Sequence, residues 1–583
     1  MSEKQESQES IWKRPWTGRW KIFTWFLLLS AAIFVPVCLV TTGGRSHQSA
    51  SEYLPLSILV ALLLAAAGMA IVAFIKWVAC WTNFRRFLFW AACFVTLLML
   101  AVLEENIRGK HAWLKHRHEL EAAGEKLDLA DLLPPPVPDE SNFALTPLFK
   151  PLYEFTPPQG REGIVWRDTN GIARLNGISA TLPVPGDRKT GMGTLEKGTF
   201  ADLNQCRDFY RGNTNYPQAN AGATPAETIL TALGKFEPEI KELREAATAR
   251  PYSRFPIQYG HQPSWEILLP HLAHLKGLTI LMCIRATAEL EAGKAPAAFD
   301  DLSLAMRFSD SVSNEPILID HLVRLATLGI DLQAIREGLV RHAWSDAELQ
   351  KFENHLRRIN LLEEYKLSMR GERALGVGGL DYLRRNGMNA KQMGYTDDDG
   401  RGRLAGGFGL MTSGFFYQNM LTISRMHDEY TLNAVNEKEH RVHPEFCDGF
   451  IKAVEKLPRT PYTIFARMLL PAVSKAVSKS ARMQFYVDAT RVGCAIERYR
   501  LANGHLPQNL QELSPKYVDS VPNDLMDGNA LKYKPDGKGG YIVYSVGWNS
   551  TDDGGQLAWR KDKKGGEVDA AKGDWVWLMA AQK

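Results

Sequence analysis

The sequence lacks the short motifs that identify most enzymes and metal proteins. It has only seven cysteines in 583 residues and no C-x-x-C pair, which argues against a zinc ribbon or a thioredoxin-like site. It has no G-x-S-x-G, and the P-loop-like spacing of residues 186–191 continues with Met192 and Gly193 where Lys and Ser or Thr are required. The net charge is only +4, and no basic stripe interleaves with aromatic residues, so nucleic acid is not the expected partner.

Three long apolar runs lie in the first fifth of the chain, at residues 22–41, 56–75 and 87–103. The first two are uncharged over a length that gives about 30 Å of helix, one hydrocarbon thickness. The third is shorter, but Trp81 and Trp90 lie where interfacial aromatics are expected. The pattern predicts three transmembrane helices within residues 22–104.

The positive charges beside these runs predict the orientation. Five Lys and Arg residues precede the first run, Arg45 is alone in the next loop, and the following loop holds Lys76, Arg85 and Arg86. Cytoplasmic loops carry the excess of Lys and Arg. We therefore expect a multi-pass protein of a bacterial inner membrane, with residues 1–21 in the cytoplasm and the chain after residue 104 exported.

The exported part is expected to be mainly α-helical. Residues 105–138 predict a helix followed by a proline-rich spacer, and residues 139–223 are rich in Gly and Pro and predict an irregular segment. Residues 224–479 carry amphipathic periodicity with helix signals such as the glycine stop at Gly293 and the capping box that begins at Ser345. Short connections between these helices predict an array of αα-hairpins. The sequence allows one or two disulfides in this part but does not show which cysteines pair; the candidates are Cys206, Cys283, Cys447 and Cys494.

The last hundred residues predict a small α+β domain at 480–583. A helical pattern ends at Asn503-Gly504, two strand-like runs flank the turn at residues 536–540, and Trp575 and Trp577 alternate as a closing strand would. The features that carry a family likeness are residues 495–507 (AIERYRLANGHLP), Tyr517, residues 521–524 (VPND), Gly528 and residues 544–547 (YSVG). In these the domain resembles the globular part of the major pseudopilin of type II secretion. The whole layout resembles large envelope proteins of planctomycete and verrucomicrobial bacteria.

The pseudopilin resemblance implies a calcium site in the terminal loop. Asp552, Asp553 and Asp574 would be its ligands, since hard carboxylate oxygens on a glycine-rich loop suit Ca²⁺. An insertion at residues 556–568 carries several cations that can instead pair with these aspartates. A calcium loop and a plain charged turn therefore both remain open.

A second set of ionisable residues lies within the helical array. How these residues are arranged distinguishes two functions. If its charges pair with one another, the protein is an interaction or scaffold protein with an envelope protein partner, linked to type II secretion or envelope organisation. If they line an open pocket, it is an exported hydrolase-like enzyme. We favour the non-catalytic interpretation. The set consists of Arg285, Glu289, Arg307, Glu315, Asp320, His321, Arg324, Glu372 and Arg373.

Overall fold

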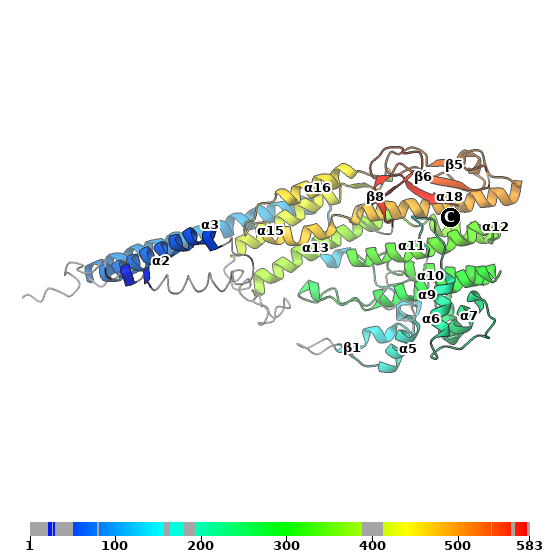
Figure 1. Cartoon of the computed structure of the whole chain (residues 1–583), viewed down its shortest axis with the longest axis horizontal. Helices are drawn as coiled ribbons and strands as arrows, with labels where there is room; N and C mark the ends of the chain where they lie inside the picture. The colour runs from blue at the N-terminus through cyan, green and yellow to red at the C-terminus, as the bar shows by residue number, and fades with distance from the viewer. Residues whose placement is uncertain are drawn as a thin grey trace, which may run out of the picture. The chain divides into compact units, whose positions relative to one another are not determined.

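The computed structural model divides the chain into two compact units, residues 1–105 and 106–583. The structure describes residues 21, 23–25, 27–28, 50–78, 81–156, 164–179, 193–387, 412–537, 539–560 and 566–579. The chain is mainly helical, with small sheets near its C-terminus (Figure 1).

The described part of the first unit includes two long helices. Helix α2 spans Ala50–Val78 and α3 spans Trp81–Ala122, so α3 begins in the first unit and ends in the second. Large apolar side chains of α3 are open to the surroundings: Trp90 is 68% and Leu97 66% exposed. An apolar surface of this extent is typical of a segment that contacts lipid or another protein.

Among the described residues, two helical stretches are long and apolar enough to cross a membrane, and one of these coincides with a predicted span. The most apolar window of Trp81–Ala122 has a mean hydropathy of 2.2 and is 0% buried. The other stretch, Ser264–Glu291, has a window that is 61% buried, as expected for a core helix. Three transmembrane helices are thus not confirmed. Most of residues 22–41 lie outside the described residues, and the apolar part of α2, Leu62–Val78, is one of the shorter apolar helices, about 26 Å long.

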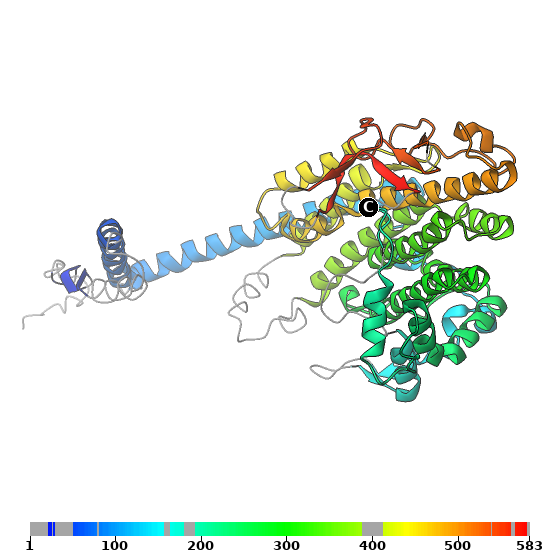
Figure 2. The same ribbon diagram turned by 45° about the vertical axis from the view of Figure 1, so that its right-hand side comes forward.

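The mainly helical character predicted for the second unit is confirmed. Helices α9, α10 and α11 pack on one another, α13 packs on α11, and α7 packs on α9 (Figures 1 and 2). The bounds are α7 Pro225–Leu233, α8 Glu237–Ala249, α9 His271–Glu291, α10 Ala295–Asp310, α11 Leu318–Val340, α12 Asp346–Leu356 and α13 Leu361–Asn386. Beyond the gap at residues 388–411 come α15 Ser413–Met426, β3 Val435–Asn436, β4 Arg441–Val442, α16 Pro444–Lys456 and α17 Ile464–Leu469.

Local signals explain where these helices begin and end. Ser345 and Glu348 form the predicted capping box of α12, and Thr224 and Glu227 form another at α7. After α9, Gly293 has a φ of 69°, a left-handed conformation that favours glycine. Each signal satisfies backbone groups that a helix end would otherwise leave unpaired.

The segment at residues 139–223 has more structure than predicted. It holds α5 (Thr169–Ser179) and α6 (Leu203–Arg211), besides α4 (Leu129–Leu132) upstream and the short strands β1 (Phe155–Thr156) and β2 (Val165–Trp166). Asp168 starts α5 by accepting the N–H of Gly171 at 2.8 Å. Ile178, which belongs to the segment predicted to be irregular, therefore lies in a helix. Cys206, Cys283, Cys447 and Cys494 are all free and buried, so none of them forms a disulfide.

The terminal part is a helix covered by a small sheet. Helix α18 (Ala476–Asn503) ends at Gly504, whose φ is 79°. Strands β5 (Lys532–Pro535), β6 (Tyr541–Ser545) and β9 (Trp575–Leu578) form an antiparallel sheet in the order β5-β6-β9, and β9 is the predicted closing strand. The sequence did not predict the antiparallel hairpin that β7 (Leu557–Trp559) forms with β8 (Val568–Gly573).

Helix α18 is buried on two sides. One side carries the sheet, because the indole of Trp577 lies against Gly493 and donates to Thr490 Oγ1 at 3.2 Å. The other side packs on α11, α12 and α13, where Gln484 Oε1 accepts the N–H of Leu361 at 2.8 Å. Figures 1 and 2 both show α18 between the strands and the array. The terminal part and the array therefore share one core.

Candidate functional site

A large cleft opens in the helical array and has a volume of about 660 Å³. Its lining comes from the C-terminal end of α10, from α11, from the α12–α13 connection and from residues 251–254. Pro134 and Pro135, expected in a spacer, lie in its wall. Clefts of this size are typical of small-molecule sites.

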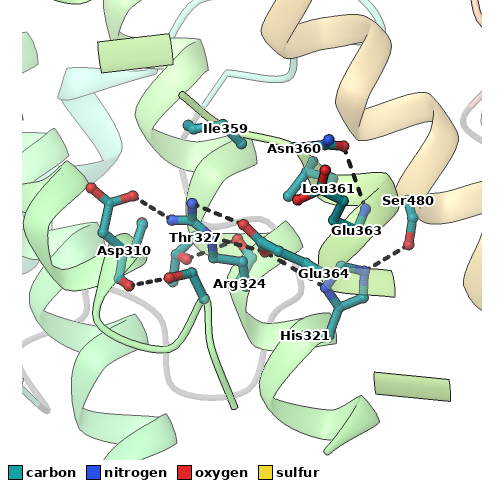
Figure 3. Close-up of polar contacts among 12 residues, drawn as sticks. Asp310, His321, Arg324, Thr327, Ile359, Asn360, Leu361, Glu363, Glu364 and Ser480 are labelled. Carbon is teal, nitrogen blue, oxygen red and sulfur yellow. Dashed lines mark hydrogen bonds and ion pairs between the residues drawn. The ribbon is translucent and has the colours of Figure 1, made fainter. Parts of the chain in front are cut away.

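Arg324 of α11 occupies the floor of the cleft and links two carboxylates. Its side chain is 2% exposed, and Nη1 donates to Asp310 Oδ1 at 2.8 Å. Its Nε and Nη2 donate to the two oxygens of Glu364 at 3.3 and 3.4 Å. His355 Nε2 lies 3.0 Å from the other oxygen of Asp310. Figure 3 shows Arg324 between the two carboxylates.

The two carboxyl groups respond to this arrangement in opposite ways. Burial raises the pKa of Asp310, but the charges of Arg324 and His355 outweigh burial and hold that pKa well below its usual range. For Glu364 burial prevails over Arg324, and the pKa is raised above its usual value. The cleft thus holds a firmly ionised carboxylate and a carboxyl group that retains its proton more readily.

A neutral histidine connects this cluster to α18. His321 Nδ1 lies 3.8 Å from Glu364 Oε2, and its Nε2 lies 2.7 Å from Ser480 Oγ (Figure 3). Burial, helped by the charge of Arg324, lowers the pKa of His321 to about 3. The imidazole is therefore uncharged at neutral pH and acts as a hydrogen-bonding link.

Local sequence explains how Glu364 reaches Arg324. The side chain of Asn360 caps α13 by accepting the N–H groups of Leu362 and Glu363. This cap places two glutamates in the first turn, where the helix dipole favours negative charge. Asn360 followed by two glutamates is a sequence signal for the helix start, but it does not show that Arg324 lies opposite.

No family profile, curated protein or solved structure matches the chain. The likeness of residues 495–507 to a pseudopilin therefore stays a prediction. The cleft and the apolar, exposed helix α3 are the features from which a function can be inferred.

The nine ionisable residues predicted as one set do not form one site. Only Arg307 and Arg324 line the cleft, with His321 beside it. Arg285 and Glu289 join a cluster around Asp301, and Arg373 pairs with Asp428 and Glu125. Glu372 accepts the N–H of Leu318 at 3.1 Å. Sequence reasoning missed six ionisable residues of the lining, because the sequence does not show which segments meet there: Arg254, Asp310, His355, Arg358, Glu363 and Glu364.

Glu315 and Asp320 lie in a separate buried cluster. Asp320 is 3.4 Å from Nε2 of His271, and Tyr259 donates its hydroxyl to Glu315. Burial raises the pKa of Glu315 to about 7. On the same helix as His271, His274 contacts Ser179 Oγ at 2.7 Å.

The shift at Glu315 predicts a pH effect on stability. Because the folded pKa is above the usual value of 4.5, the stabilising contribution is full below pH 4.5 and is lost as the pH rises through about 7. We expect Glu315→Gln to match the native chain at pH 5 and to exceed its free energy of unfolding by about 2 kcal/mol at pH 9. Urea unfolding at both pH values checks this. An equal difference at the two pH values would contradict it.

The predicted calcium loop is held by hydrogen bonds to its own backbone. Asp574 is 2% exposed and accepts the N–H groups of Asp553 at 3.1 Å and Gly555 at 2.6 Å. Asp552 pairs with Lys532 at 3.5 Å. Within the described residues no group of three or more His, Cys, Asp or Glu side chains is arranged to hold a metal ion. Of the cations in the insertion, Arg560 pairs with Glu567 at 4.0 Å, and Lys561, Lys563 and Lys564 lie outside the described residues.

Calcium binding at this loop stays a prediction with a direct test. If Asp552, Asp553 and Asp574 bind Ca²⁺, a hundredfold excess over Kd adds about 2.7 kcal/mol to stability, and Asp553→Ala removes this gain. Asp574→Ala should cost about 1–3 kcal/mol even without calcium, since two partly buried N–H groups lose their acceptor. Melting curves at constant ionic strength, with Mg²⁺ as the control, measure both effects. A melting temperature indifferent to calcium would leave only the backbone role of Asp574.

Proposed function

We propose that this protein is a membrane-anchored binding protein whose exported helical array holds a ligand in the cleft. One observation supports the proposal: the ion-pair cluster of Arg324, Asp310 and Glu364 is open to the cleft on one side. Arg324 itself is 2% exposed, but the side chains of Asp310 and Glu364 are 27% and 14% exposed and line the cleft. An ion-pair cluster that served packing alone would be closed by neighbouring side chains.

The anchor and its orientation are part of this proposal. Three membrane helices within residues 22–104, with residues 1–21 in the cytoplasm, would place the array outside the cytoplasm. The apolar, exposed surface of α3 and the excess of Lys and Arg before the first apolar run support it.

Reporter fusions test the orientation. Fusions after Thr42 and after Lys126 should be active outside the cytoplasm, and a fusion after Trp81 only inside, because positive charges stay in the cytoplasm. Phosphatase and fluorescent-protein reporters in the same positions give opposite readouts. An inside signal at Lys126 would contradict export.

The terminal part is proposed to bind an envelope protein partner, as its likeness to a pseudopilin of type II secretion suggests. Its helix followed by the β5-β6-β9 sheet supports this role. Trp559 of β7 is 46% exposed and offers an aromatic anchor for such a partner.

Blocking the cleft tests the binding function. Asn314 is exposed and lines the cleft, so Asn314→Trp should fill part of it without disturbing the core. Molecules that copurify with the full chain in mild detergent are identified by mass spectrometry, from the native protein and from the variant. We expect a compound that the native chain retains and Asn314→Trp loses. Asn433→Trp, at an exposed position outside the cleft, is the matched control.

A hydrolase is the second candidate function. The specific observation is that one cleft holds two carboxyl groups with pKa values shifted in opposite directions, an arrangement suited to a base and an acid. In that case the native chain should convert the retained compound, and Glu364→Gln should keep binding it but not convert it. Recovery of the compound unchanged after incubation with the native protein favours binding alone.

A further inference from the structure

The lining of the cleft has more positively charged side chains than carboxylates. Its lining holds four arginines and three carboxylates, an excess of one positive charge when His355 is neutral. Arg324 and His355 already serve Asp310 and Glu364. The arginines that remain are Arg254, Arg307 and Arg358.

Many of the arginines packed in this unit are paired with carboxylates, although a few, such as Arg250, donate only to carbonyl oxygens. Arg285 and Arg373, for example, each contact carboxylates from two different segments. No described carboxylate lies within ion-pair distance of Arg254, Arg307 or Arg358. The charge of Arg254 acts on Glu315, and that of Asp310 on Arg307, only at longer range.

Arg307 is held in the wall of the cleft by contacts that carry no negative charge. Its Nη2 donates to the carbonyl oxygens of Arg250 and Tyr252 at 2.9 and 3.0 Å, and its guanidinium lies 4.8 Å from the centre of the Phe143 ring. Its Nε is buried without a hydrogen-bond partner. Carbonyl oxygens and a ring face hold the group in place but do not neutralise it, and an uncompensated guanidinium in a wall is costly.

The rest of the lining is partly apolar. Pro134, Pro135 and Ile359 belong to the wall, and Tyr252, which is 59% exposed, offers a ring for stacking. The volume of about 660 Å³ exceeds that of a single oxyanion, so an anionic group would fill only part of the cleft.

We propose that the cleft binds a small organic molecule through a carboxylate or phosphate group, which Arg254, Arg307 and Arg358 hold while the molecule's apolar part lies against Tyr252 and the prolines. The guanidinium fork matches the geometry of both oxyanions, so the arginines define the shared chemistry and not its source. This inference rests on the proposed function, because it names the ligand class of the same cleft.

The experiment titrates two simple anions into the full chain in detergent micelles. Inorganic phosphate and citrate are the probes, chloride keeps the ionic strength constant, and calorimetry measures the affinity. Arg254→Gln/Arg358→Gln is the test variant, because neither side chain is fully buried. Arg385→Gln is the matched control, since Arg385 is 68% exposed and outside the cleft. Arg307→Gln is left aside because its guanidinium packs on Phe143.

We expect at least one of the two anions to bind the native chain and Arg385→Gln with about millimolar Kd, as a fragment of a larger ligand would. The test variant should bind it at least tenfold more weakly, with an unchanged melting temperature in chloride. Binding of phosphate alone assigns a phosphate group, and binding of citrate alone assigns a carboxylate. Equal affinity in the test variant, or no binding of either anion, overturns the inference.

The two proposals fail separately. If Asn314→Trp loses a copurifying compound but neither anion binds, the cleft binds a ligand of another class and only the anion inference falls. If Asn314→Trp and Asn433→Trp retain the same compounds as the native chain, the binding function itself falls.

Discussion

Gly371→Ala should destabilise the helical array by about 4 kcal/mol or more. Gly371 is a buried residue of α13, and a Cβ added there would lie 1.5 Å from the carbonyl oxygen of Pro316. That oxygen belongs to the backbone immediately before α11, so neither partner can rotate away and the two segments must separate. Urea unfolding of the full chain in detergent micelles, followed by tryptophan fluorescence, measures the loss.

Gly378 provides the control within the same helix. A Cβ at this position would meet nothing within 4 Å. Gly378→Ala should therefore be neutral or stabilise the chain by up to about 1 kcal/mol, because alanine is the better helix former. A loss at Gly371→Ala no larger than the effect of Gly378→Ala would mean that α13 and the Pro316 segment are not in close contact.

Arg373→Leu should cost about 3–5 kcal/mol, since Asp428 and Glu125 each lose a fully buried cationic partner, although Arg370 still pairs with Glu125. Arg373 is 0% exposed, pairs with Asp428 and donates to Glu125 Oε2 at 2.8 Å and to the carbonyl oxygen of Lys126. Glu125 follows the end of α3, so this arginine joins that segment to α13. Arg385→Gln, at a side chain that is 68% exposed, should cost less than about 1 kcal/mol.

The pH dependence of the Arg373→Leu effect provides a second check. Hydrogen bonds with Arg370, and then with Arg373, outweigh burial and lower the pKa of Glu125 to about 2. Stability from this carboxylate is present above its usual pKa of 4.5 and is lost as the pH falls through about 2. The difference between native and Arg373→Leu chains should therefore shrink in acid. A difference that is constant from pH 7 to pH 3 would show that lost packing, not lost charge pairing, causes the effect.

The elements that the sequence predicted well are those set by short-range signals. Ser345, Gly293 and Gly504 act on backbone groups within a few residues, so their patterns can be interpreted without knowledge of the rest of the chain. The closing strand at Trp575 was equally visible, because alternation shows within four residues. Helix α5 was missed because its start depends on Asp168 in a segment rich in Gly and Pro.

The cleft could not be predicted in the same way. Asp310, Arg324 and Glu364 are 14 and 40 residues apart along the chain, and which charges meet depends on how α10, α11 and α13 pack. Composition showed that the array holds many ionisable residues, but it did not show that some pair inside the core while Arg254 and Arg358 line the open cleft. The same limit applies to the terminal segment, whose pattern predicted a self-contained domain.

Helix α18 has a consequence for how the chain can vary in length. An inserted residue would turn the following part of the helix by about 100°. On a surface helix a nearby loop can absorb such a change, but here the face under Trp577 and the face that meets α13 would both lose their partners. Insertions and deletions should therefore be confined to segments outside α18, such as the β7–β8 hairpin. A chain truncated before Ala476 would lack a wall of the array itself as well as the terminal sheet.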